Sequence, residues 1–142
     1  MEKKFKLPKE FALKWVEALR SGEYTQGEGD LAIIDENEDG TVTLQNTSFC
    51  CLGVAGYLCG NNISKLASES YLDNSFKDVP TLLLGYSSDN SLVKVLSHLN
   101  DGTSSSDVLK GEFVFRREIK HPYDKLTFLE IADFIEDNVE FV

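Results

Sequence analysis

Residues 18–31 combine side chains that recognise charged and aromatic ligands with a glycine-rich stretch of backbone. Arg20 offers a planar guanidinium fork for a phosphate or a carboxylate, and Tyr24 offers a face for stacking. Gln26 carries a paired donor and acceptor that suits the edge of a base. Together with Ser21, which follows the arginine, these residues are the first candidates for ligand binding.

The same stretch also fits a purely structural interpretation. In that case Arg20 compensates the negative end of a helix, and Gly22 ends the helix in a left-handed conformation. Tyr24 then packs on Trp15 rather than on a ligand. The spacing alone does not choose between the two interpretations.

Sequence motifs that mark common catalytic sites are missing, since the chain has no GxSxG, HExxH or GxxxxGK[ST] pattern. A thiol dyad of Cys50 or Cys51 with His98, supported by Asp101, would need the fold to assemble it. The 24 acidic residues mostly decorate a solvated surface, so no pair stands out as an acid and a base. We therefore expect a protein that is not an enzyme and uses no cofactor.

The cysteines point to ordinary packing. Cys50, Cys51 and Cys59 are odd in number and two are adjacent, which suits neither a disulfide framework nor a CxxC zinc site. We expect reduced, mostly buried thiols. A zinc site that includes His98 or His121 would again have to be assembled by the fold, and we predict no metal site.

The charge balance disfavours one class of function. Lys and Arg number 14 against 24 Asp and Glu, a formal net charge of -10, which argues against a nonspecific duplex binder. A local group of arginines can still hold a small anion, because exposed charges are screened over about 8 Å at physiological salt. No stretch has the ~20 apolar residues of a membrane span, and no signal peptide is evident. We expect a cytoplasmic protein that binds neither duplex nucleic acid nor a membrane.

The first half of the chain predicts a helix, a hairpin and a second helix. Apolar residues recur at three- and four-residue steps over residues 8–21. Strand-like runs at 31–34 and 41–44 flank the turn sequence ENEDG, which predicts a β-hairpin. The apolar block at 48–58 predicts a buried helix with Ser48 as its N-cap.

The second half is patterned only in part. Residues 61–90 give no clear signal, whereas residues 92–99 predict a short amphipathic helix and residues 113–118 alternate like a strand with one basic edge. A Thr-x-x-Glu capping box at residue 127 opens a last helix. The chain, residues 1–142, is therefore predicted to be a single compact α+β domain, with a small antiparallel sheet or hairpin packed by about four helices.

Three short patterns occur together in this chain. They are Trp15 with ALRSG at 18–22, Tyr24 and Gln26; FCCLGV at 49–54; and an Asn-Asp turn at 100–101 followed by a helix at 127–138. Together they resemble a widespread family of small proteins found in bacteriophages and prophages. The chain departs from that family at residues 55–56 and in a long insertion before the closing helix. The insertion carries Arg116 and Arg117.

Small phage proteins of this kind include anti-defence sponges, which sequester the cyclic nucleotide signals of bacterial immune systems such as CBASS. The resemblance therefore implies a noncatalytic binder of a cyclic oligonucleotide or related nucleotide in the host bacterial cytoplasm. On this hypothesis arginines hold phosphates, an aromatic ring stacks on a base, and polar side chains read base or ribose edges. The predicted ligand-binding residues are Arg20, Ser21, Tyr24, Gln26, Asn100, Asp101, Arg116 and Arg117.

Energetics of such a complex predict a homo-oligomer. Two stacked bases at roughly 1–3 kcal/mol each and two arginine contacts at roughly 1.5–3 kcal/mol each give about 5–12 kcal/mol before costs. A nanomolar complex needs about 12 kcal/mol after the costs of ordering are met. We therefore expect a ligand site that is shared between chains.

Two other classes of function stay open. An acidic inhibitor could occupy a basic site on a host protein, in which case Arg20 would be purely structural. A nucleotide-cleaving enzyme would release a product of altered mass, whereas a sponge would release the intact signal.

Overall fold

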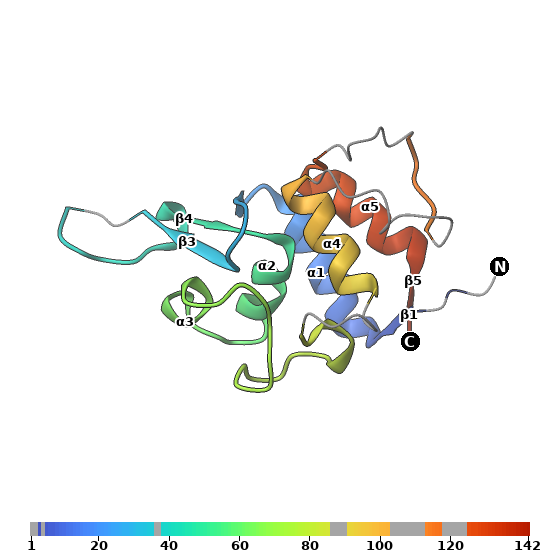
Figure 1. The fold of residues 1–142 in the computed structure, drawn as a ribbon, viewed down its shortest axis with the longest axis horizontal. Helices are drawn as coiled ribbons and strands as arrows, with labels where there is room; N and C mark the ends of the chain where they lie inside the picture. The colour runs from blue at the N-terminus through green and yellow to red at the C-terminus, as the bar shows by residue number, and fades with distance from the viewer. Residues whose placement is uncertain (1–2, 4, 36–37, 86–90, 103–112, 118–124) are drawn as a thin grey trace.

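The computed structural model describes residues 3, 5–35, 38–85, 91–102, 113–117 and 125–142, which form helices around two small sheets (Figure 1). The helices are α1 (Lys9–Ser21), α2 (Cys51–Leu58), α3 (Ile63–Ala67), α4 (Ser91–Asp101) and α5 (Phe128–Asn138), with single 3-10 turns η1 (Leu44–Asn46) and η2 (Thr81–Leu83). The strands are β1 (Phe5–Leu7), β2 (Thr25–Gln26), β3 (Ala32–Ile34), β4 (Thr47–Phe49) and β5 (Val139–Phe141). The predicted α+β class is confirmed, with five helices among the described residues where about four were expected.

The two sheets lie on opposite sides of the helices (Figure 1). On one side β1 pairs in parallel with β5, with Phe5 opposite Val139 and Leu7 opposite Phe141. On the other side the strand order is β2-β4-β3, parallel between β2 and β4 and antiparallel between β4 and β3. The sequence does not predict the β1–β5 pair, because a three-residue strand is too short to establish an alternating pattern.

The predicted hairpin is wrong in its second strand. Ala32–Ile34 does form β3, but its antiparallel partner is Thr47–Phe49 rather than residues 41–44. Burial explains the choice, because the strand β4 places Phe49 fully inside the core, whereas Val42 stays 38% exposed. The backbone at Asn46 closes the longer connection by accepting a hydrogen bond from the Asp35 amide at 2.8 Å.

Helix α1 is confirmed almost to the residue. Its apolar face includes Trp15, which is fully buried and donates its indole N–H to the Cys51 carbonyl at 2.9 Å. Gly22 ends the helix with φ of 79°, a left-handed conformation that glycine adopts without strain. The ring partner of Tyr24 differs from the one considered in the sequence analysis: it packs edge-on against Phe49, with the ring centroids 5.7 Å apart.

Helix α2 begins later than predicted. The expected N-cap, Ser48, lies in β4, and Cys50 takes the cap position, where its sulfur accepts a hydrogen bond from the Gly53 amide at 3.3 Å. Glycine is required at 53, because a Cβ there would lie only 1.7 Å from the Leu31 carbonyl oxygen. Gly56 also reflects close packing, since a Cβ there would lie 2.8 Å from a Leu66 methyl group. Glycine is a weak helix former, and close packing explains why both positions nevertheless carry it.

The last two helices follow the predictions. Helix α4 ends at Asp101, and Gly102 follows with φ of 77°. The Thr127–Glu130 capping box at the start of α5 is formed, with both of its hydrogen bonds. In the described part of the chain, no helix is long and apolar enough to cross a membrane.

Residues 113–117, within the predicted strand 113–118, are not a strand; Glu118 lies outside the described residues. This segment runs along α5 instead, where the buried Asn138 holds it. The Asn138 amide accepts from the Val114 N–H and donates to the Val114 carbonyl, both at 2.8 Å. The predicted alternation survives, since Phe113 and Phe115 are partly buried and Val114 is 51% exposed.

Candidate functional site

Six of the eight predicted ligand residues fall into two clusters. We call Gln26, Asn100 and Asp101 the amide cluster, and Arg20, Arg116 and Arg117 the arginine cluster. The amide cluster joins the end of α4 to β2 and the loop after it, whereas the arginine cluster joins α1 and residues 113–117 to carboxylates of α5.

Asn100 is the centre of the amide cluster and is fully buried. Its side-chain oxygen accepts from the Gln26 amide at 3.1 Å and from the Cys51 N–H at 3.2 Å. Its side-chain nitrogen donates to the Gly27 carbonyl at 2.8 Å and to Asp101 Oδ1 at 2.9 Å. Four hydrogen bonds satisfy the whole amide group, so this asparagine holds the fold together and has no capacity left for a ligand.

Gln26 and Asp101 extend the amide cluster in opposite directions. The Gln26 side chain also donates to the Leu126 carbonyl at 2.8 Å, close to the start of α5. Asp101 accepts from the Gly29 N–H at 3.2 Å and borders an open hollow of about 470 Å³. The other residues along this hollow are Gly29, Ser70, Tyr71, Ser97, His98 and Gly102.

Arg20 connects α1 to α5 within the arginine cluster. It lies in the last turn of α1, and its Nη2 contacts Asp133 Oδ1 at 2.7 Å and the Glu136 carboxylate. These hydrogen bonds raise the pKa of the guanidinium and lower the pKa of Glu136. Because the Arg20 side chain is 34% exposed, the ion pairs are partly screened by water.

Arg116 reaches Asp133 and Glu136 from the segment that runs along α5. Its Nη1 lies 2.9 Å from Asp133, and its Nε and Nη2 form a two-pronged contact with Asp137 at 2.8 and 3.1 Å. The contact with Asp137 lowers the pKa of that carboxyl group. Arg116 is 53% exposed, and the adjacent Arg117, 45% exposed, pairs with Glu130. Both guanidinium groups are thus held in place at the surface.

A small cavity opens between the two arginines and α5. It holds about 150 Å³ and is lined by Phe115, Arg116, Arg117, Leu126, Glu130, Asp133 and Phe134. Phe115 stacks on Phe134 with ring centroids 5.3 Å apart, which gives the cavity an aromatic wall. We call it the arginine pocket; it combines an apolar wall with two cations and two carboxylates.

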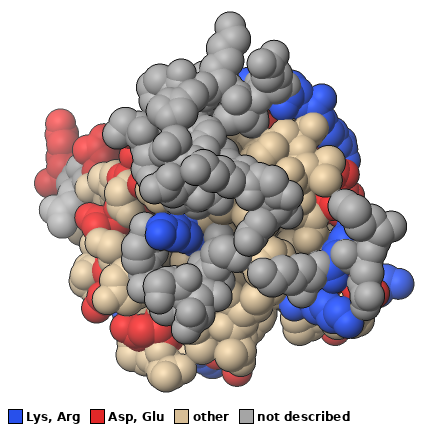
Figure 2. All heavy atoms as spheres, turned by 45° about the vertical axis from the view of Figure 1, so that its right-hand side comes forward, with Lys and Arg blue, Asp and Glu red and all other residues tan. Residues whose placement is uncertain are grey.

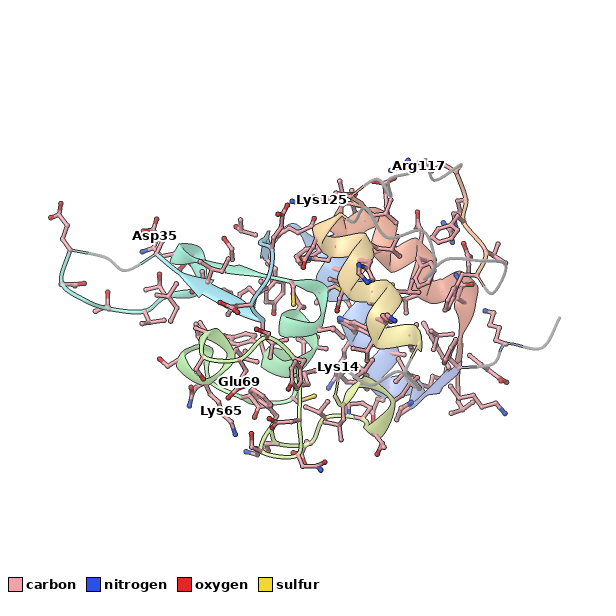
Figure 3. All side chains as sticks on the ribbon, viewed as in Figure 1. Lys14, Asp35, Lys65, Glu69, Arg117 and Lys125 are labelled. Carbon is pink, nitrogen blue, oxygen red and sulfur yellow. The ribbon has the colours of Figure 1, made fainter. Side chains whose placement is uncertain are left out.

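Basic and acidic side chains are unevenly distributed over the surface of this acidic protein. Figure 2 brings forward the side that carries α5 and β5, and there the Lys and Arg side chains gather mainly along the right edge and the Asp and Glu side chains mainly along the left. Figure 3 shows Arg117 and Lys125 above α4 and α5, far from Asp35 on the arm that β3 begins. At the pocket itself the arginines are balanced by carboxylates, since Arg20, Arg116 and Arg117 pair with Glu130, Asp133, Glu136 and Asp137.

The two remaining predicted residues lie outside both clusters. The Ser21 hydroxyl donates to the Ala18 carbonyl at 2.7 Å, within the last turn of α1. Tyr24 packs against Phe49 and Tyr57, and burial is the main cause that raises the pKa of its phenol. The contacts of these two side chains are those of helix termination and core packing.

The cysteine pair is close to Asp101 but is not activated. Burial raises the pKa of Cys50 to about 12 and raises that of Cys51 well above its ordinary value. The Cys51 thiol donates to the Leu96 carbonyl at 3.8 Å. Since the thiolate is the nucleophile, these groups have the character of inert packed thiols. Burial also lowers the pKa of His98 on α4.

In the described part of the chain, no three His, Cys, Asp or Glu side chains come together in a way that could hold a metal ion. His121, the second histidine considered for a zinc site that was not predicted, lies outside the described residues.

Sequence reasoning missed five residues of the arginine pocket, Leu126 among them. Phe115 was expected only as part of a strand, and Phe134, Glu130 and Asp133 were not singled out for binding. The apolar period of α5 marks its core face, and Glu130 is recognisable as a capping residue. Asp133 lies beside two arginines that are distant in the sequence. No sequence signal predicts this, because it depends on how α1 and residues 113–117 pack against α5.

Comparison with known proteins gives one match. A family described as "Domain of unknown function (DUF8296)" matches residues 7–139, a range that includes both clusters. Neither the curated proteins nor the solved structures give a match. Because the matched range covers most of the chain, the protein belongs to the DUF8296 family.

Proposed function

We propose that the protein is a noncatalytic binder of a nucleotide signal and that the arginine pocket takes one base of that signal. The biological role we attach to this activity is that of a phage-encoded anti-defence protein, which sequesters a cyclic oligonucleotide or related immune signal. The carrying observation is the meeting of an aromatic wall, two arginines and two carboxylates around one small cavity.

Size and shape support a single ring as the occupant. A cavity of about 150 Å³ is similar in volume to one that admits a benzene ring. Stacking on an aromatic side chain contributes roughly 1–3 kcal/mol per base and tolerates any base. The Phe115–Phe134 pair offers such a wall beside the polar groups.

Phosphate binding is supported by the exposed ion pairs that Arg116 and Arg117 form. Arg116 and Arg117 contact carboxylates at the surface, and exposed ion pairs of this kind are weak. A phosphate offers the same two-pronged geometry as a carboxylate, with more negative charge. In the proposed complex a phosphate displaces one of the three carboxylate partners of Arg116, and the other two keep its guanidinium group in position.

The pocket volume also supports the expected homo-oligomer. One ring fills the cavity, so a cyclic dinucleotide with two bases needs a second cavity. Two chains that share one ligand would supply two aromatic walls and four arginines. Such sharing raises the binding energy into the range that a nanomolar complex requires.

The proposed function is tested by retention. The purified protein is incubated with a panel of cyclic di- and trinucleotides, free ligand is removed by filtration, and the heat-released material is identified by mass spectrometry. Intact nucleotide from the native protein, with much less from an Arg116→Ala variant, is the expected result. A released product of altered mass would replace the proposal with a nucleotide-cleaving enzyme. No retention across the panel would contradict it and put the acidic protein-binding inhibitor first.

A further inference from the structure

The hollow beside Asp101 is a concave surface separate from the arginine pocket. Its volume of about 470 Å³ lies within the range of roughly 300–1,000 Å³ that is typical of small-molecule sites. Three segments that are distant in the sequence border it: the loop after β2, residues 70–71 after α3, and the end of α4. The described residues that line it differ from those that line the arginine pocket. The hollow therefore has room for a ligand of its own.

The end of α4 brings polar groups with unused hydrogen-bonding capacity to this hollow. Asp101 accepts from the Gly29 N–H and from the Asn100 amide with the same atom, Oδ1, so within the described part of the chain its Oδ2 has no hydrogen-bond partner. The Ser97 hydroxyl and the His98 imidazole also make no hydrogen bond to a described residue. The hollow thus offers a ligand one carboxylate oxygen, one hydroxyl group and one imidazole.

The charges at the hollow favour a neutral ligand. Burial lowers the pKa of His98, and the neighbouring Lys94 lowers it further, so the imidazole is uncharged at neutral pH. An uncharged imidazole donates one hydrogen bond and accepts another. Asp101 repels a phosphate, whereas the charge of Lys94 offsets the attraction of Asp101 for a cation. A ligand that carries hydroxyl groups can use all the polar groups without bringing a charge.

Tyr71 adds an aromatic surface to these polar groups. It lines the hollow and is 46% exposed, which leaves much of this large side chain accessible. An aromatic side chain of this kind has an apolar body and a polar tip. A sugar ring is built in a similar way, with an apolar C–H face and hydroxyl groups at its rim. It can lie against Tyr71 with its face and reach the end of α4 with its rim.

We propose that the hollow binds a sugar ring with neighbouring hydroxyl groups. One hydroxyl donates to Asp101 Oδ2, others exchange hydrogen bonds with Ser97 and His98, and the ring lies on Tyr71. A carboxylate also binds the ribose hydroxyl in dinucleotide sites. The ribose of a nucleoside and a hexose present the same pair of hydroxyls. This site is independent of the proposed function, because a 3′,5′-linked cyclic dinucleotide has no neighbouring hydroxyl pair on its ribose.

Titrations followed by NMR test the site. Adenosine, 2′-deoxyadenosine and methyl α-D-glucopyranoside are added separately, at millimolar concentrations, to the ¹⁵N-labelled protein. We expect amide shifts centred on Gly29, Tyr71 and Gly102 with adenosine, with the glucoside or with both. Adenosine alone would identify a nucleoside as the source of the sugar, and the glucoside alone would identify a hexose.

The deoxy compound makes the test specific for hydroxyl groups. If adenosine binds, 2′-deoxyadenosine should bind about tenfold more weakly, because it lacks one hydroxyl of the pair. Equal affinities of these two nucleosides would overturn the proposal. Shifts centred on the arginine pocket, or no shifts with any of the three compounds, would also overturn it. None of these results changes the outcome of the retention test with cyclic nucleotides.

Variants locate the contacts. Asp101→Asn keeps a side-chain oxygen for Gly29 and Asn100 but removes the second acceptor, so sugar affinity should fall by about tenfold. Asp30→Asn is the matched control: Asp30 is exposed and accepts from Ser70 at the border of the hollow, but it does not line the hollow. It loses the same charge and should bind the sugar as the native protein does.

The variants can also contradict the proposal. Unchanged affinity in Asp101→Asn, or an equal fall in both variants, would overturn the role given to the Asp101 carboxylate. Tyr71→Ala provides a second measurement on an exposed side chain, and it should lower the affinity several-fold. Unchanged affinity in that variant would overturn the stacking contact. Thermal melts of all three variants establish that they are folded at the temperature of the titrations.

Discussion

The amide cluster and the arginine cluster both consist of polar side chains of types that bind ligands, yet their surroundings differ. Asn100 is fully buried and makes four hydrogen bonds within the chain, whereas Arg116 is half exposed and pairs with carboxylates at the edge of a cavity. A buried polar group that is satisfied internally is costly to disturb and has little to offer a ligand. An exposed ion pair is cheap to rearrange and can exchange partners. Polar side chains thus hold the fold in one place, and in the other we propose that they exchange their partners for a ligand.

The largest effect is expected at the centre of the amide cluster. Replacing Asn100 with leucine leaves the Cys51 N–H and the Gly27 carbonyl buried without their partner. We expect a loss of roughly 3–5 kcal/mol in the free energy of unfolding. Urea denaturation checks this, with the exposed Asn74→Ala as a control that changes stability by less than about 0.5 kcal/mol. A loss below about 1 kcal/mol for Asn100→Leu would show that the amide cluster does not hold the fold.

Asn138 connects fold and pocket, because it fixes residues 113–117 on α5. Asn138→Leu removes both hydrogen bonds to Val114, so we expect a loss of roughly 1–3 kcal/mol in stability together with at least a tenfold loss of nucleotide affinity. Asn61 is a matched control: it is equally buried, 7% exposed, and its side chain bonds both the N–H and the carbonyl of Lys77.

Affinity separates the two asparagines. Asn61→Leu should cost a similar amount of stability and leave the affinity of the folded protein unchanged, as measured by calorimetry well below the melting temperature. If both variants lost affinity equally, general destabilisation would account for the effect and Asn138 would have no positioning role.

Arg116 should behave in the opposite way to Asn100. Arg116→Ala removes a surface guanidinium, so the urea midpoint should change little, while nucleotide affinity should fall by about tenfold or more. Lys125→Ala is the control for loss of one positive charge, since Lys125 pairs with Glu28 on the same side of the molecule and does not line the cavity (Figure 3). Equal losses of affinity in the two variants would reduce the arginine pocket to a nonspecific electrostatic surface.

The smallest effect is expected in the stability of the protein at low pH. Arg20 and Arg116 lower the pKa of Glu136 and Asp137 in the folded protein, so these groups bind protons less readily than in the unfolded chain. Their contribution to stability is present above the unfolded pKa values near 4 and is lost as the pH falls through the lower folded values. The urea midpoint should therefore decline below about pH 4, and less steeply in Arg20→Gln. An identical pH dependence in both proteins would show that these pairs do not stabilise the fold.

Local signals in the sequence predict α1, α2, α4 and α5, whereas α3 lies in residues 61–90, which give no clear signal. The spacing of apolar residues, Gly22 and the Thr127 capping box define α1 and α5 because each signal acts within one or two turns. The β3–β4 pairing was mispredicted, since the choice between residues 41–44 and Thr47–Phe49 depends on burial across the whole core. A strand partner is a long-range property that a turn sequence alone does not determine.

The candidate site was predictable by residue type but not by arrangement. Arg116 and Arg117 were singled out as a basic pair, and the structure places both at the cavity. Asn100 was singled out as well, but a buried asparagine and a ligand-binding one look alike in a sequence. Only the packing of α4 against the loop after β2 reveals that its hydrogen bonds are already made.

Mapping a bound nucleotide by NMR tests the contrast between the clusters most directly. Backbone amide shifts of the ¹⁵N-labelled protein are recorded while cyclic di-GMP is added to saturation. The account predicts the largest shifts at residues 113–117 and in the first half of α5, with small shifts at Gly27, Gly29 and Asn100. Largest shifts around the amide cluster, with residues 113–117 unmoved, would contradict it.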